Sequence, residues 1–257
     1  MKKLTTFTFE DEDLKSYREE EFLIIEIKQN AFQIVTDLSG SSHLFDLLDL
    51  TENHSDMKGV LLVNHPGCFG EAKYEDYLKK ILRINAGEKM DLLAAHESQS
   101  IRKRQINILN QFILNSLRMQ KLVIVGLQGD VVTPFMGGSL AADIRFGSQD
   151  MSFSLAHLTF GLHPSGALPY LLPRYLGISR AKDLLLRGGK IPAEGAMKLG
   201  LINQILPAEN FLEACITEVK KMQRIDLRLI KITKQLMNIY SEELARYFEY
   251  EARVSFF

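Results

Sequence analysis

Short, continuous runs of apolar residues are the clearest pattern in this chain. Residues 22–27, 59–64 and 122–127 consist mostly of Ile, Leu and Val, and residues 144–146 are a shorter candidate of the same kind. Such runs are typical of strands that are buried on both faces of a sheet. The pattern therefore predicts four strands.

A different spacing lies between the strands. In residues 101–119, the apolar residues Leu109, Phe112, Ile113 and Leu117 recur at intervals of three and four, which places them on one face of a helix. Helical segments that separate strands are typical of an α/β chain with parallel pairing. The sequence therefore predicts the α/β fold class.

Helical patterns dominate the end of the chain. From Ala193 onward nearly every segment has helical spacing, and Pro192 suits a helix start while Gly200 suits its end. We therefore expect an α/β core in residues 1–190 and a helical region in residues 191–257.

Composition narrows the function classes without choosing one. The 257 residues have a net charge of −1, so no overall field favours nucleic acid or an anionic membrane. Two cysteines are too few for a disulfide framework or a zinc site, and we expect no bound metal. With no signal peptide and no apolar run near twenty residues, we expect a cytoplasmic protein that does not enter a membrane.

Ordered motifs in the second half of the chain carry a family resemblance. They keep their order and spacing without a gap, and they occupy residues 128–129, 142–145, 172–177, 179–186 and 193–203. This set resembles the crotonase superfamily of enoyl-CoA hydratases and isomerases. A weaker match extends upstream through residues 59–64 and 68–73.

The resemblance implies both an architecture and a class of ligand. It implies a spiral of repeated ββα units followed by a C-terminal helical region, which builds a homotrimer or a hexamer. The implied partner is an acyl-CoA or an acyl-carrier thioester. No separate cofactor is implied beyond the CoA moiety of such a ligand. The implied chemistry uses an oxyanion hole of two backbone N–H groups, and two glutamates move protons in the hydratases.

The two oxyanion donors map to two positions, of which only the first has a backbone N–H. The first falls on the backbone of Lys73, preceded by Ala72, and a backbone donor tolerates a changed side chain. The second falls on Pro134, which has no N–H. The resemblance therefore predicts a rearranged second donor, for which the N–H of Phe135 is the candidate, or the loss of this half of the site.

Neither implied glutamate is present at its mapped position. The first position holds Gly137, in a register fixed from both flanking motifs. An alternative alignment would match residues 136–138 to the family's glycines, but it removes about three residues from the following helix. The second position holds His157. Hydration by a pair of glutamates is therefore not expected.

The candidate side chains allow a functional and a structural interpretation. His157 could act as an acid or base near neutral pH, or it could be a histidine tolerated at a relaxed site. His163 could face the acyl pocket or lie in an ordinary loop. Glu71 and Lys73 could act across the site, and Cys68 has no identifiable activating base.

Two hypotheses follow. One is an acyl-thioester enzyme with a rebuilt site, a lyase, isomerase or hydrolase, that uses His157 and enolate stabilisation. The other is a scaffold that has lost hydratase chemistry and binds an acyl thioester or serves in assembly. Because several independent positions depart from the family's active site, the sequence favours the second.

Overall fold

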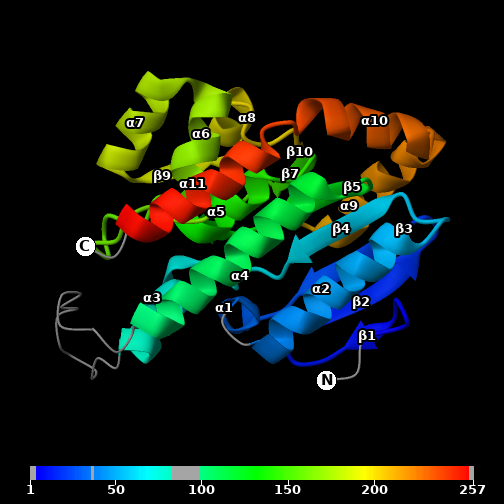
Figure 1. The fold of residues 1–257 in the computed structure, drawn as a ribbon, viewed down its shortest axis with the longest axis horizontal. Coiled ribbons are helices and arrows are strands. Elements are labelled where there is room, and N and C mark those ends of the chain that lie inside the picture. The colour runs from blue at the N-terminus through cyan, green and yellow to red at the C-terminus, as the bar shows by residue number, and fades with distance from the viewer. Residues whose placement is uncertain (1–3, 36–37, 83–98, 255–257) are drawn as a thin grey trace.

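A seven-stranded sheet runs through the molecule (Figure 1). The structure is a computed structural model that describes residues 4–35, 38–82 and 99–254. The strand order is β1-β2-β3-β4-β5-β7-β10; the first three strands pair antiparallel and the others parallel. The strands are β1 (Phe9–Glu10), β2 (Leu14–Glu19), β3 (Phe22–Ile27), β4 (Gly59–Asn64), β5 (Leu122–Leu127), β7 (Ile144–Ser148) and β10 (Gln204–Leu206).

The four predicted strands are confirmed. β3, β4 and β5 begin and end at the predicted residues, and β7 extends the shorter candidate to Ser148. Every residue of β4 and β5 is buried. Since these strands lie in the middle of the sheet, both of their faces need apolar side chains, and this requirement produced the continuous runs in the sequence.

A second, smaller sheet creates the repeated unit of the fold. It contains β6 (Asp130–Val132), β8 (Ser152–Ser154) and β9 (Lys190–Pro192). The chain twice passes from the large sheet to the small sheet and then into a helix, as β5–β6–α5 and as β7–β8–α6. The predicted ββα repetition is therefore present.

Helices cover the sheets and form the end of the chain (Figure 1). The first six are α1 (Ala31–Ile34), α2 (Leu38–Asn53), α3 (Glu71–Leu82), α4 (Gln99–Arg118), α5 (Thr133–Leu140) and α6 (Leu168–Leu176). The others are α7 (Ile178–Arg187), α8 (Ala193–Lys198), α9 (Phe211–Lys220), the 3-10 helix η2 (Lys221–Arg224), α10 (Leu227–Met237) and α11 (Ser241–Val254). Among the described residues, no helix is long and apolar enough to cross a membrane.

The C-terminal helices are present, with one departure from the sequence prediction. Strand β10 pairs with β7 beyond Ala193, where we expected helices alone; its three residues are too few to show a period. A buried ion pair ties α10 to the sheet, because Lys234 Nζ lies 2.5 Å from Asp143 Oδ2 and also donates to Lys121 O at 2.8 Å. The division into two domains at residue 190 stays a prediction.

Candidate functional site

The starts of α3 and α5 lie next to each other. The N–H of Val132, which directly precedes α5, donates to the carbonyl oxygen of Phe69, two residues before α3, at 3.0 Å. Residues more than sixty positions apart are therefore joined where both helices begin. The family resemblance places the two oxyanion donors, at Lys73 and Pro134, in these helix starts.

The first turn of α3 presents backbone donors. The first hydrogen bond of this helix runs from Tyr74 N–H to Gly70 O at 3.0 Å. The N–H groups of Glu71, Ala72 and Lys73 consequently belong to the terminal turn, where a helix supplies no carbonyl partner of its own. Both Ala72 and Lys73 are exposed. This geometry suits the role mapped to the Lys73 backbone, which stays a prediction.

The first turn of α5 is built differently. Thr133 is its first residue and Pro134 its second, so one N–H that a helix start normally offers is missing. The N–H of Phe135 follows, still within the first turn. All eight residues of α5 are buried. A second donor at this start would therefore be the buried N–H of Phe135.

A loop closes directly over the position of the first mapped glutamate. A Cβ placed on Gly137 would lie 2.1 Å from Gly166 O and 3.0 Å from Ser165 O. The contact is reciprocal, because a Cβ on Gly166, whose φ is +69°, would lie 2.4 Å from Pro134 O. Backbone therefore packs on backbone here. Position 137 has no room for a side chain, and hence none for a carboxylate.

Aromatic rings occupy the space beside the start of α5. The ring of Phe135 stacks on Phe69 with centroids 4.0 Å apart and contacts Phe32 at 4.8 Å. Phe32 in turn stacks on Tyr74 and Tyr77 at 5.3 and 5.1 Å. These five rings, named here the aromatic cluster, join α1, α3 and α5. The space beside the start of α5 is therefore filled by apolar contact.

His157 is buried, with both ring nitrogens engaged. Its exposed fraction is 1%. Nε2 lies 3.0 Å from Leu185 O, and since a carbonyl only accepts, Nε2 carries the hydrogen. Nδ1 is then the acceptor for the Thr133 hydroxyl at 3.0 Å, whose longer contact is Ser154 O at 3.3 Å. Burial lowers the pKa of His157 below its usual value. These contacts join the neutral ring to α5 and α7.

The loop that covers Gly137 also contains His163. This side chain is half-buried, and its Nδ1 lies 3.2 Å from Pro164 O. His163 thus lies two residues from Ser165, whose oxygen approaches Gly137. The structure therefore places His163 in a loop that packs on α5, while a role in binding substrate stays a prediction.

A polar cluster beside α3 was missed by sequence reasoning. Glu71 accepts a hydrogen bond from Ser154 Oγ at 2.7 Å and pairs with Lys190 Nζ at 3.2 Å. Lys190 also contacts Asp130 at 2.7 Å, a hydrogen bond that raises the pKa of its ammonium group. Asp130 accepts from Ser152 Oγ at 2.6 Å. The alternation of Ser152 and Ser154 along β8, which places both on one face, was the available signal.

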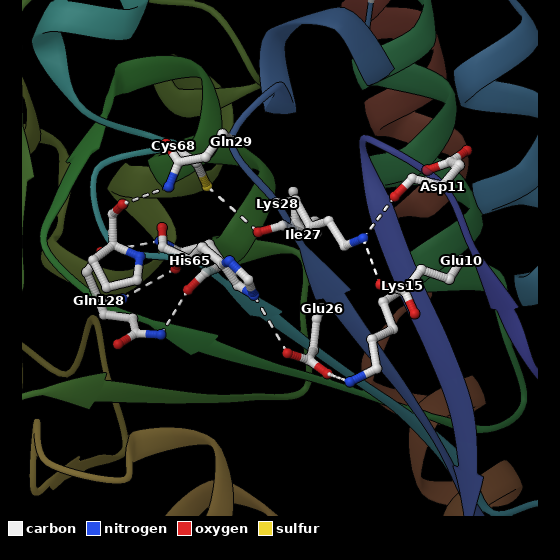
Figure 2. Close-up of polar contacts among 12 residues, drawn as sticks. Glu10, Asp11, Lys15, Glu26, Ile27, Lys28, Gln29, His65, Cys68 and Gln128 are labelled. Atoms are coloured by element: carbon white, nitrogen blue, oxygen red, sulfur yellow. Dashed lines mark hydrogen bonds and ion pairs between the residues drawn. The ribbon is translucent and has the colours of Figure 1, made fainter.

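Charged side chains also gather at the carboxyl end of β3 (Figure 2). Glu26 contacts Lys15 at 3.1 Å and His65 at 3.3 Å, and Lys28 contacts Glu10 at 2.8 Å. Both lysines thus face a carboxylate, and His65 contacts Glu26. These contacts join the neighbouring strand ends.

Cys68 lies in the same region but is not activated. Its Sγ is 3.7 Å from Ile27 O, which can only accept, so the sulfur carries its proton (Figure 2). Burial raises the pKa of the Cys68 thiol to about 12. The side chain is therefore a thiol at neutral pH and not a nucleophilic thiolate.

Comparison with known proteins decides the family. A sequence model described as enoyl-CoA hydratase/isomerase matches residues 86–256, about two thirds of the chain. The chain belongs to the enoyl-CoA hydratase/isomerase family.

Relatives within this family are distant. A probable enoyl-CoA hydratase, EchA12 of Mycobacterium bovis, is 28% identical over 203 residues, which cover 74% of this chain and 71% of that protein. The trans-2-decenoyl-[acyl-carrier-protein] isomerase of Streptococcus mutans is 25% identical over 73% of this chain and 76% of its own. The crystal structure of an enoyl-CoA hydratase from Bacillus halodurans superimposes with a TM-score of 0.77 at 20% identity, covering 93% and 92% of the two chains.

Family membership confirms the fold and the resemblance that predicted it. The structural match covers 93% of the chain. Members of the enoyl-CoA hydratase/isomerase family act on acyl-CoA thioesters, so such a ligand fits this chain.

Proposed function

We propose that this protein is an acyl-thioester-binding member of the enoyl-CoA hydratase/isomerase family that does not hydrate its ligand. The observation that carries the proposal is the closure of Gly137 by the carbonyl of Gly166. A glutamate at position 137 would require the loop to move. The site is therefore organised around packing where the hydratase reaction needs a carboxylate.

The other candidate groups support the same conclusion. His157 uses Nε2 on Leu185 O and Nδ1 on Thr133, so a proton transfer would first break a buried hydrogen bond. Glu71 is the carboxylate at the start of α3, but it is engaged by Ser154 and Lys190. These contacts favour a structural role for both His157 and Glu71.

The first turn of α3 supports retained thioester binding. Its terminal N–H groups and the positive end of the helix dipole favour a carbonyl oxygen or an anion. Ala72 and Lys73 are exposed, so a ligand can approach them. Binding by this turn needs neither Pro134 nor the position of Gly137. The chain can therefore hold a thioester without the second half of an oxyanion hole.

Two measurements test the proposal. Butyryl-CoA should raise the melting temperature of the protein, while crotonyl-CoA should be hydrated no faster than in buffer. Turnover of crotonyl-CoA that disappears in His157→Gln would overturn the proposal in favour of an enzyme with a rebuilt site. Absence of stabilisation by any CoA thioester would overturn the binding half.

A matched pair of variants locates the binding. Lys73→Pro removes the backbone N–H and is tolerated by geometry only near a helix start, whereas Lys73→Ala removes only the side chain. We expect Lys73→Pro to weaken butyryl-CoA binding at least tenfold and Lys73→Ala to change it less than threefold. If Lys73→Pro does not fold, the amide resonance of Lys73 in the unaltered protein should shift on titration with butyryl-CoA.

The proposed state is a homotrimer or hexamer. The apolar side chains of α10 and the residues after it point to solvent in a single chain. Exposed members are Leu229, Ile232, Leu236, Met237 and Ile239. An apolar face of this kind is typical of a subunit interface. Light scattering should give three or six times the mass of one chain, and a monomer at micromolar concentration would contradict this part of the proposal.

A further inference from the structure

A cavity lies between α10 and the segment that joins α5 to β7. Its volume is about 490 Å³. Sites for small molecules typically measure about 300–1,000 Å³, so the cavity has the size of a ligand site. Tyr175 of α6 and Tyr240, which follows α10, also line it. Lys73, Gly137 and His157 are not among the described residues of its lining, so it is separate from the thioester site proposed above.

Three charged side chains belong to the described lining, and two of them neutralise each other. Lys234 is 6% exposed, and its Nζ lies 2.5 Å from Asp143 Oδ2. The same Nζ donates to Ser116 O at 3.3 Å and to Lys121 O at 2.8 Å. An ammonium group has three N–H donors, so all three are in use. The third charge, on Arg145, is therefore the one that a ligand can meet.

Arg145 is buried without a carboxylate partner among the described residues. The residue is 4% exposed. Its Nε donates to Leu201 O at 2.8 Å and its Nη1 to Ala142 O at 2.6 Å, while Cζ lies 5.0 Å from the ring centre of Tyr175. Carbonyl oxygens and a ring orient the guanidinium but carry no net charge. Nη2 has no partner in the described part of the chain. Because a buried charge is costly unless it is paired, this arrangement favours an anion beside Arg145.

The rest of the lining suits an apolar body that carries one polar head. Leu140, Leu229 and Ile230 contribute large aliphatic side chains from α5 and α10. Leu229 is also 61% exposed, so the cavity can be reached from solvent. Burial raises the pKa of Tyr240 to about 12, so its hydroxyl keeps its proton at neutral pH and can donate to an anion.

We propose that this cavity binds a carboxylate with a hydrocarbon chain of medium length, with its head at Arg145 and its chain along Leu229 and Ile230. A carboxylate supplies the opposite charge and accepts from a guanidinium in a favourable geometry. A doubly charged phosphate would exceed the one surplus cation of the described lining. The site does not depend on the proposed thioester function, and an acyl-CoA bound at α3 should leave it available.

The experiment uses octanoate as the probe and methyl NMR of the full chain as the measurement. With isoleucine δ1-methyl groups labelled, Ile225 and Ile230 in the cavity wall should shift saturably. Ile232 and Ile239, on the exposed C-terminal face, should not shift. 1-Octanol has the same chain with a neutral head, and it should bind roughly tenfold more weakly, because a hydrogen bond to a charged group contributes more than one to a neutral group.

Variants test the charge and the position separately. Arg145→Gln should weaken octanoate binding roughly tenfold and change 1-octanol binding by less than about threefold. If this variant does not fold, Thr233→Glu gives a second test, because it adds a carboxylate to the lining at an exposed position. It should also weaken octanoate binding roughly tenfold by repulsion. Gln235→Glu, at an exposed position of the same helix outside the described lining, is the matched control and should change the affinity less than about threefold.

Several results would overturn the proposal. Equal affinities for octanoate and 1-octanol would exclude recognition of the charge, and unchanged octanoate binding in Thr233→Glu would exclude the cavity. Shifts confined to Ile232 and Ile239 would assign the binding to the exposed face. Binding by the double variant Ile232→Ser with Leu236→Ser, without binding by the unaltered protein, would assign the cavity to a subunit interface. Displacement of octanoate by butyryl-CoA would make it part of the thioester site, whereas a failure of butyryl-CoA binding alone would affect only the proposed function.

Discussion

Helices α5 and α10 differ in how completely a single chain buries them. Every residue of α5 is buried, and at Gly137 its backbone touches the backbone of a loop. On α10, by contrast, Leu229 is 61% exposed and Leu236 74% exposed. The rest of the chain packs around α5 on all sides, whereas one face of α10 contacts solvent. The difference shows that α5 belongs to the core of a single chain, whereas α10 presents large apolar side chains to solvent.

The largest effect is expected at the joint between these two regions. Lys234→Met removes the cation from the pair that ties α10 to Asp143, leaving a buried carboxylate without its partner. Loss of one member of a buried pair typically costs about 3–5 kcal/mol. Denaturant unfolding should show a loss of this size. The control is Lys231→Met, at an exposed position of the same helix, which should change stability by less than about 0.5 kcal/mol.

A comparable result in both lysine variants would contradict this account. The structure would then hold α10 in place by its apolar contacts alone. Restoring stability in the double variant Lys234→Met with Asp143→Asn would support it, because the second change removes the unpaired charge.

The next effect tests whether α5 is closed. Gly137→Ala adds a methyl group 2.1 Å from Gly166 O, so backbone must move, and we expect a loss of about 3 kcal/mol. Gly138→Ala is the matched control, because among the described atoms its added methyl meets Leu109 Cδ1 alone, at 3.3 Å, and alanine favours a helix. Chemical denaturation measures the free energy of unfolding of both variants. Equal stability would mean that the loop is free to withdraw and that position 137 can accept a side chain.

The sequence predicted the framework of this fold well for a physical reason. A strand buried on both faces needs apolar residues at every position, so 22–27, 59–64 and 122–127 are visible within six-residue windows. The order of the motifs then predicted the family, which the matching sequence model confirmed. Strand β10 was missed because Gln204–Leu206 is too short to show any period.

For the site, the sequence predicted which residues to examine but not the contacts that they make. Glycine at 137 indicates the absence of a side chain, but the carbonyl that fills the space comes from residue 166. His157 gains its partners from Thr133, 24 residues away, and from Leu185, 28 residues away. Such contacts depend on how loops pack between helices, and no local pattern encodes that packing.

A third test concerns α11, a helix of the C-terminal region that does pack on the core. Glu251 is 6% exposed, and burial raises its pKa to about 7, with Tyr247 donating to it at 3.0 Å. The unfolded carboxyl loses its proton near pH 4.5, before the folded one does. Stability from this group is therefore present below pH 4.5, falls as pH rises to about 7, and then stays lower.

Replacing Glu251 by glutamine should remove that fall. Glu251→Gln should match the unaltered protein at pH 4 and exceed it at pH 8 by on the order of 2–3 kcal/mol. Exposed Glu249→Gln on the same helix is the control and should show no such dependence. Thermal melts of the two variants and the unaltered protein across this pH range measure the difference in stability. A difference between Glu251→Gln and the unaltered protein that does not change with pH would contradict the raised pKa of Glu251 in the folded protein.

The smallest effect on folding, and the most direct test of the comparison, comes from the exposed face of α10. Ile232→Ser combined with Leu236→Ser removes two large apolar side chains that contact solvent in the single chain. Exposed substitutions typically change stability by no more than about 0.5 kcal/mol, so the folded monomer should be retained. The mass from light scattering should nevertheless fall to that of one chain, because the covering surface would lose its apolar contact. An assembly that withstands both changes would place the interface elsewhere, and α10 would then be exposed in the assembled protein as well.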